Sequence, residues 1–391
     1  MGELVKKFKS SLKWIKPEHF LFFYLLFVPF RDFFPRIPII DVSLLNLIGP
    51  LLTLFLLAEI FRKKRKLVNI PQNYFIIGFA LAAVISALSA GNKIYSLVYL
   101  KCLARNIMLF FIITQIITSK KLLKQAILVL VISGLFASFF GISQYIFQFN
   151  LHNGRILGTH NDPNYFAAIL VGLMPLSFYF FIEQKKIIFK AVFLSIFFII
   201  LLAFGLTQSR GGMIGFAAAF ILVFFKQENK LKLLGLFFFF FLLFVLLLPA
   251  SFWLRTATLV GYHEGKYNQD TMVMRTKYWS GGLRIFRDNP LLGVGPANHY
   301  LYMAQYVDIP AKASHNTFID IAADLGIFGI LFFILILIYT FINTRRFKNK
   351  LYYNYLEIGL IGLLVAGLFI GVHITPVLTW ILMGMCSAKT K

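Results

Sequence analysis

Long apolar blocks alternate with short polar segments along the whole chain. Each block is close to the ~20 residues that an α-helix needs to cross the hydrocarbon core of a membrane. The pattern predicts an all-α polytopic integral membrane protein with about twelve transmembrane helices, built as a single membrane domain over residues 1–391. The predicted spans cover roughly residues 20–34, 40–60, 71–90, 94–118, 122–149, 163–183, 187–206, 210–225, 231–250, 315–343, 352–371 and 373–388, the first and last being short.

Lysine and arginine gather in short runs that fall at every second segment between spans. The runs lie at residues 6–16, 62–66, 120–124, 185–190, 226–232, 345–350 and 389–391. Cytoplasmic loops carry an excess of these residues, so we expect both termini in the cytoplasm. The net charge of +24 would suggest nucleic-acid binding in a soluble protein. Here membrane topology explains it, and we expect membrane lipids rather than nucleic acid as partners.

Two further features limit the class of protein. The first apolar block begins near His19 and has no small-residue cleavage site after it, which indicates a retained span rather than a signal peptide. Cys102 and Cys386 both lie in apolar segments without CxxC spacing, so the sequence supports neither a disulfide framework nor a zinc site.

One outer segment is much longer than the others. Residues 251–314 form a predicted periplasmic loop between the ninth and tenth spans. Long loops are usually functional or disordered, and the aromatic content of this one favours order. Projected as a helix, residues 273–288 are amphipathic, with Arg275 on the same face as Trp279 and Phe286. Lys277, Arg284 and Asp288 fall on the opposite face.

Two arginines on the outer side need an explanation. A cation on the buried face of a helix requires an anionic partner, so Arg275 meets either a ligand or an internal carboxylate such as Asp162. Arg210 stands at the boundary between the seventh and eighth spans and is followed by Gly211 and Gly212, which allow close approach of backbone or ligand. The alternative for Arg210 is an interfacial arginine that reaches the lipid headgroups.

The stretch "ASHNTFIDIAADLG" (313–326) opens the tenth span. Ser314 is the expected N-cap, which places His315 in the first helical turn, where the positive helix end would keep its imidazole neutral. A neutral imidazole can act as a general base, although a simple capping role is the alternative. Asp320 and Asp324 project to the other side and are interpreted as structural. Their expected partner is a cation elsewhere, for example Lys101 or Arg105.

The stretch "GTHNDPNYFA" (158–167) carries turn and N-cap chemistry before the sixth span. His160 and Asp162 could bind a metal together with His152, but the three lack a recognisable ligand spacing. No DxD pair lies on the outer side, which disfavours a Mg²⁺-dependent reaction with a nucleotide sugar. A transferase acting there would need a donor already in the membrane, such as a lipid-linked sugar pyrophosphate. Two arginines and a histidine fit that chemistry.

Three motifs in order carry a resemblance to a known family. They are "SRGG", "MRTKYWSGGLRIFRDNPLLGVGP" and "SHNTFIDIAADLGIFG". Together they resemble the bacterial O-antigen ligase and polymerase superfamily, specifically over about residues 150–345. The resemblance implies a GT-C-like helical fold in the bacterial inner membrane and an active site facing the periplasm. It also implies inverting, metal-independent glycosyl transfer from undecaprenyl pyrophosphate, without a cofactor. Arg210 and Arg275 would contact the pyrophosphate, and His315 would be the base.

Several readings of the function remain open. The favoured reading is an O-antigen ligase of lipopolysaccharide biosynthesis, which moves a glycan from the lipid carrier to a hydroxyl of lipid A-core. The alternatives are a polymerase that extends a lipid-linked glycan, a protein O-oligosaccharyltransferase and, in a different class, a lipid-linked glycan transporter. A transporter would spread polar residues through the membrane depth within an inverted repeat, which the sequence does not show. The further candidate substrate-binding residues are His160, Asn161, Tyr278, Arg284 and Asn316.

Overall fold

The computed structural model describes residues 16–37, 42–62, 64, 66–257, 271–310, 312–346, 351–370 and 377–390. The long helices are α2 (Pro17–Phe27), α3 (Ile48–Phe61), α4 (Gln72–Ser89), α5 (Lys93–Ile116), α6 (Lys120–Ile146), α7 (Pro163–Glu183), α8 (Ile187–Leu206), α9 (Arg210–Lys226), α10 (Lys230–Leu247), α14 (Thr317–Arg346), α15 (Leu351–Gly367) and α16 (Val377–Ser387). The elements between α10 and α14 are α11 (Ala250–Ala257), α12 (Thr271–Asp288), α13 (His299–Tyr302) and the 3₁₀ turn η5 (Met303–Gln305).

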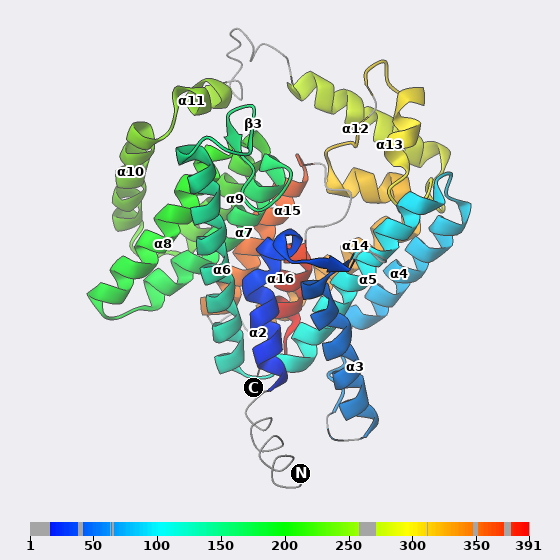
Figure 1. The fold of residues 1–391 in the computed structure, drawn as a ribbon, viewed down its shortest axis with the longest axis horizontal. Coiled ribbons are helices and arrows are strands. Elements are labelled where there is room, and N and C mark those ends of the chain that lie inside the picture. The colour runs from blue at the N-terminus through cyan, green and yellow to red at the C-terminus, as the bar shows by residue number, and fades with distance from the viewer. Residues whose placement is uncertain are drawn as a thin grey trace.

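Each predicted span has a corresponding helix in the described part of the chain, and the polytopic all-α fold is confirmed (Figure 1). Seven of these helices are long and apolar enough to cross a membrane: α4, α5, α6, α7, α8, α10 and α14. The first and last spans are short, as expected. After α2 the chain passes into the 3₁₀ helix η1 (Val28–Phe33), and η2 (Leu44–Leu47) precedes α3. The start of the predicted last span, residues 373–376, lies outside the described residues.

Strands are confined to two short antiparallel pairs among the described residues. β1 (Arg36–Ile37) pairs with β2 (Val42–Ser43), and β3 (Leu151–His152) pairs with β4 (Arg155–Ile156). The second pair lies between α6 and α7 and carries a side chain that supports the site described below.

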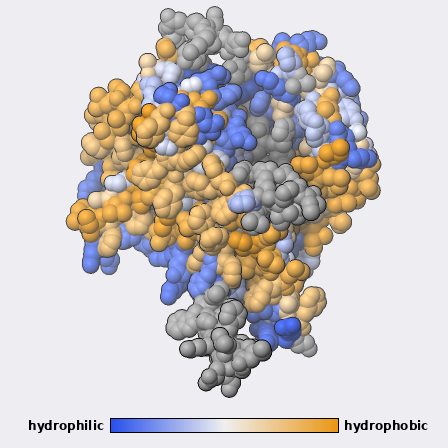
Figure 2. Space-filling model, viewed as in Figure 1, coloured by the Kyte–Doolittle hydropathy of each residue, from blue (hydrophilic) through white to orange (hydrophobic). Residues whose placement is uncertain are grey.

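Helix α7 lies at the centre of the bundle and packs against α8, α9 and α15. The crossing of α7 and α15 is very close, because a Cβ atom on Gly359 would lie 2.5 Å from the carbonyl oxygen of Gly172. Small residues allow such close helix packing inside a membrane. Helix α10, in contrast, exposes Leu231, Phe238 and Leu246 at the periphery. On the face seen in Figure 2, an apolar band lies between hydrophilic residues above and below it.

Hydrogen bonds between segments distant in sequence show which interhelical loops lie at the same end of the helical bundle. At one end, Lys389 Nζ donates to the carbonyl oxygen of Asn69 at 2.8 Å, and Lys226 Nζ donates to Asn354 Oδ1 at 3.0 Å. Both lysines belong to the predicted cytoplasmic runs. At the other end, the backbone N–H of Asn92 donates to Asn298 Oδ1 at 2.7 Å. Segments 66–72 and 387–390 thus contact each other, and segment 226–230 contacts the start of α15. The C-terminus lies at the end opposite to α11, α12 and α13 (Figure 1).

Helix α14 is interrupted, which the sequence pattern did not predict. Gly326 has φ 66° and ψ −161°, so the helix breaks at this residue. The loop after α12 packs into the break: Val294 N–H donates to Ala323 O and Gly295 N–H to Asp324 O, both at 3.0 Å. A Cβ atom on Gly326 would lie 2.3 Å from Leu291 O. The break thus attaches the long loop to the membrane bundle.

Candidate functional site

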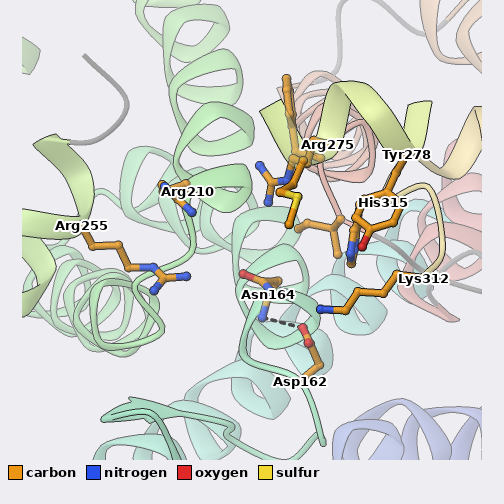
Figure 3. A pocket seen from close by; sticks show the side chains of 11 residues that line it. Asp162, Asn164, Arg210, Arg255, Arg275, Tyr278, Lys312 and His315 are labelled. Carbon is orange, nitrogen blue, oxygen red and sulfur yellow. Dashed lines mark hydrogen bonds between the residues drawn. The ribbon is translucent and has the colours of Figure 1, made fainter. Parts of the chain in front are cut away.

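A cavity of about 250 Å³ opens at the end of the bundle where α11 and α12 lie. Six separate segments contribute to it: the start of α7 with its N-cap, the start of α9, α11, α12, the linker before α14 and the segment after α15 (Figure 3). Its polar lining consists of Asp162, Asn164, Arg210, Arg255, Arg275, Tyr278, Lys312 and His315. The structure therefore brings the three predicted catalytic residues to one cavity, together with Tyr278.

Arg210 is the first residue of α9, half-buried at the helix N-terminus. Ser209 caps this helix, because its Oγ accepts from the N–H of Gly212 at 3.3 Å. The two glycines after the arginine allow close packing of the protein itself: a Cβ atom on Gly211 would lie 2.8 Å from Phe369 Cβ. They hold the helix start against its neighbours and so fix the position of Arg210.

A buried arginine that the sequence analysis missed supports this turn. Arg155, from β4, donates through Nε to Thr207 O at 2.7 Å and through a terminal nitrogen to Asn164 Oδ1 at 2.8 Å. Ser209 Oγ donates to the same Asn164 oxygen at 2.9 Å. Burial, and then the charge of Arg255, lower the pKa of Arg155 to about 9. The turn before Arg210 is therefore hydrogen-bonded to Arg155, a cation from the β3–β4 hairpin.

Arg275 lies on α12, and its guanidinium points into the cavity on the side of Arg210 in Figure 3. The helix is amphipathic as predicted, with Trp279 packed against the ring of Phe369 at 5.8 Å and Gly282 buried. Leu283, on the same helix, is exposed. Burial, followed by the nearby charge of Arg255, lowers the pKa of Arg275. Burial and repulsion between neighbouring cations thus disfavour the charged form of Arg275, and a bound anion would favour it.

His315 does not lie in the first turn of the helix, so that prediction is wrong. Asn316 is the N-cap, with its Oδ1 accepting from the N–H groups of Phe318 and Ile319 at 3.0 and 3.2 Å. His315 precedes the helix in a left-handed conformation with φ 59°. Its pKa is lowered, first by burial and then by the charge of Arg275. The imidazole is neutral near pH 7, as expected, but burial and an arginine account for it.

The acidic pair of α14 binds a side chain of the long loop. Asp320 and Asp324 both pair with His299 of α13, whereas the sequence analysis expected a cation such as Lys101 or Arg105. The side chain of Arg105 instead donates to Asn106 Oδ1 at 3.3 and 3.4 Å. His299 was missed because it lies in the long loop, far in sequence from the two carboxylates.

The other candidate substrate-binding residues lie outside the cavity lining. Arg284 is exposed and donates to the carbonyl oxygen of Tyr306 at 3.3 Å. Asn161 is exposed, and His160 packs edge-on against Tyr165, with ring centroids 4.8 Å apart, beside a separate small cavity. Asn316 uses its side-chain oxygen as the cap of α14. Tyr278 does reach the cavity, and its hydroxyl donates to Pro310 O at 2.7 Å.

Two cavity cations were not among the sequence candidates. Arg255 lies on the short helix α11, and Lys312 lies in the linker before α14. Helix α11 is strongly amphipathic, which is the one sequence signal that would have drawn attention to Arg255.

Asp162, the carboxylate in the cavity lining, is the N-cap of α7. Its Oδ1 accepts from the N–H groups of Asn164 and Tyr165 at 2.7 and 2.9 Å.

The metal alternative finds no geometric support. Within the described residues, no group of three or more His, Cys, Asp or Glu side chains lies close enough to hold a metal ion. His152, His160 and Asp162 thus do not form the three-ligand site considered from the sequence.

The cavity has an excess of positive charge. Arg210, Arg255, Arg275 and Lys312 line it, whereas Asp162 is its one carboxylate among the described lining residues. Arginine presents a fork of N–H donors that matches phosphate oxygens, and such pairs strengthen away from bulk water. The arrangement can bind a multiply charged anion beside a neutral imidazole.

Comparison with family models gives a match over part of the chain. Residues 195–334 match the model described as O-antigen ligase. This segment is less than half of the chain, and it is similar to the O-antigen ligase and polymerase superfamily. The match contains Arg210, Arg275 and His315, and it supports a glycosyltransferase-like membrane enzyme with lipid-linked substrates. No curated protein matches the chain.

Proposed function

We propose that the protein is an O-antigen ligase that transfers a glycan from undecaprenyl pyrophosphate to a hydroxyl of lipid A-core. The observation that carries the proposal is the cavity in which Arg210 and Arg275 lie beside His315, a neutral histidine. The superfamily match over the same three residues supports it. We further propose that the helical bundle is GT-C-like and that residues 251–314 form a large periplasmic loop of a single membrane domain.

The proposed orientation places the cavity in the periplasm. The basic segments gather at the opposite end of the bundle, and cytoplasmic loops carry most Lys and Arg. The protein would therefore lie in the bacterial inner membrane with both termini in the cytoplasm. On the periplasmic side the donor is the lipid-linked glycan itself, whose activation is already stored in the bond between sugar and pyrophosphate.

The proposed reaction needs charge stabilisation and one proton acceptor. Arg210 and Arg275, with Arg255 and Lys312 nearby, bind the pyrophosphate oxygens. The imidazole of His315 takes the proton of the acceptor hydroxyl while its oxygen attacks the anomeric carbon. The bond from that carbon to the pyrophosphate oxygen breaks on the opposite face, so the configuration inverts. Undecaprenyl pyrophosphate leaves as the anion, and the proton stays on His315.

The test uses the purified full-length protein in lipid nanodiscs with an undecaprenyl-pyrophosphate-linked glycan. One sample receives lipid A-core, and a second receives only further lipid-linked glycan. The proposal expects a single transfer product with lipid A-core and no ladder in the second sample. A ladder without lipid A-core would instead establish a polymerase. No product in either sample, with the donor shown to bind, would refute glycosyl transfer to these acceptors.

A further inference from the structure

A second histidine at the same end of the bundle lies between two carboxylates. Nε2 of His299 is 3.0 Å from Asp320 Oδ1, and Nδ1 is 3.0 Å from Asp324 Oδ1. The side chain of His299 is fully buried, and those of the two aspartates are 4% and 3% exposed. Only a protonated imidazole has an N–H donor at both nitrogens. Each ring nitrogen lies within ion-pair distance of a carboxylate oxygen, which fits an imidazolium between two carboxylates.

Asp324 holds one end of this cluster in place. Its carboxylate accepts from three consecutive backbone N–H groups, those of Ala297, Asn298 and His299, at 2.9, 3.0 and 2.8 Å. Its own carbonyl oxygen accepts from Ser86 Oγ at 2.8 Å. The loop that carries His299 is thus attached to α14, and the position of the imidazole is fixed.

Asp320 connects the cluster to the cavity. The Oδ1 that faces His299 also accepts from the backbone N–H of Ser314 at 3.1 Å and from its hydroxyl at 2.6 Å. Ser314 is the residue before His315, whose left-handed φ of 59° requires a well-determined backbone. One carboxylate oxygen therefore touches both His299 and the residue that sets the backbone path into His315.

We propose that His299 is a positioning residue for His315: it holds Asp320 in place, and Asp320 fixes Ser314 and the backbone of His315. This inference rests on the proposed function, in which His315 takes the acceptor proton. His299 itself does not line the cavity and touches no substrate. Its second effect is electrostatic, because its charge offsets that of a carboxylate close to His315.

The electrostatics of the two histidines agree with this arrangement. Burial lowers the pKa of His299, but the charges of Asp324 and Asp320 outweigh burial and raise it well above its usual value. For His315, burial and Arg275 lower the pKa, whereas Asp320 raises it. Lys312 lowers it and Asp162 raises it, and Tyr278 lies against the ring with its centroid 6.0 Å away. Tyr99 of α5 is the other titratable group near the two aspartates.

The test compares His299→Gln with Asp320→Asn in the purified full-length protein. For His299→Gln we expect at least a tenfold lower kcat and an unchanged KM for the lipid-linked donor. The acid limb of the pH profile of kcat should move to higher pH. The negative charge of Asp320 then raises the pKa of His315 without the positive charge of His299 to offset it. For Asp320→Asn the limb should move to lower pH. Opposite shifts are a signature that loss of structure alone does not produce.

The controls separate this inference from folding and from the proposed function. Asp308→Asn makes the same change at an exposed loop position and should leave the profile unchanged. If His299→Gln does not fold, Ser314→Ala removes a contact of Asp320 without altering buried charge, and it should lower kcat severalfold with KM unchanged. Folded His299 and Asp320 variants with the wild-type acid limb, or with shifts in the same direction, would overturn the inference. An inactive wild type, or a fully active His315→Ala, would instead refute the proposed function.

Discussion

His299 and His315 lie at the same end of the bundle, and their surroundings move their pKa values in opposite directions. His299 is enclosed by Asp320 and Asp324, and these charges raise its pKa well above the usual value. His315 lies beside Arg275, and burial and that cation lower its pKa. Burial alone would lower both. The sign of the neighbouring charge therefore decides which histidine is held as a cation and which as a neutral imidazole.

The His299 cluster and the cavity beside His315 differ in their balance of charge. In the His299 cluster one cation lies between two carboxylates, and both carboxylates also accept hydrogen bonds from other protein groups. The cavity combines Arg210, Arg255, Arg275 and Lys312 with a single carboxylate among its described lining residues. An excess of one charge sign in a concave site favours a ligand of the other sign. The predictions below test this division, from the largest expected effect to the smallest.

The largest effect is expected in the cluster. Asp324→Ala leaves the imidazolium of His299 with one carboxylate and removes the acceptor of three backbone N–H groups. Breaking a buried ion pair in this way costs about 3–5 kcal/mol. We expect the free energy of unfolding to fall by that amount in denaturant titrations of the purified protein. Asp308→Ala, an exposed control, should change it by less than about 0.5 kcal/mol.

In the cavity, Arg210→Ala and Arg275→Ala should impair transfer and leave stability intact. Losing one donor to a developing negative charge costs about 10²–10³ in rate. Initial rates with saturating lipid A-core measure the loss. Lys277→Ala, on the exposed face of the helix that carries Arg275, is the matched control and should transfer normally. Equal losses of transfer rate in Lys277→Ala and Arg275→Ala would show that the effect does not depend on the position of Arg275 in the cavity.

Arg155→Ala should give a smaller, indirect effect. The change leaves Asn164 and the carbonyl oxygen of Thr207 without this donor and loosens the turn before Arg210. Unsatisfied buried groups cost about 1–3 kcal/mol, and we expect the KM for the donor to rise correspondingly, by about tenfold. Arg287→Ala removes an exposed arginine and should leave KM unchanged. An unchanged KM in Arg155→Ala would contradict the supporting role of the hairpin.

The pH dependence should show the neutral base. Because the pKa of His315 is lowered below its usual 6.5, the imidazole is neutral at pH 7 and becomes protonated only in more acidic solution. The kcat for transfer should be constant above pH 7 and should fall about tenfold per pH unit below that pKa. A limb above pH 7 would indicate a different base.

The membrane spans could be predicted from the sequence because they depend on local composition alone. Any stretch of about 20 apolar residues must lie in the membrane, and basic runs mark one side of it. The half-buried position of Arg275 was also predictable, because a single helix projection determines it. The side chains that surround it come from five other segments, and no local pattern reveals that they meet.

The start of α14 shows why details of the site were missed. Ser314 and Asn316 are both good N-cap residues, so local preference does not decide between them. Asp320 decides it by binding the N–H and hydroxyl of Ser314, which leaves Asn316 to cap the helix. The partner of Asp320 was equally hidden, because His299 belongs to a loop that folds back onto the broken helix. Long-range contacts of this kind fix the geometry of His315.

The most direct test is the single-turnover transfer rate of His315→Ala with saturating lipid-linked donor and lipid A-core. Loss of a general base should lower this rate by about 10²–10⁴. Binding of undecaprenyl pyrophosphate should stay at the wild-type level, because the arginines remain in place, and His152→Ala, an exposed histidine control, should behave as wild type. A His315→Ala variant that transfers at the wild-type rate would contradict the account.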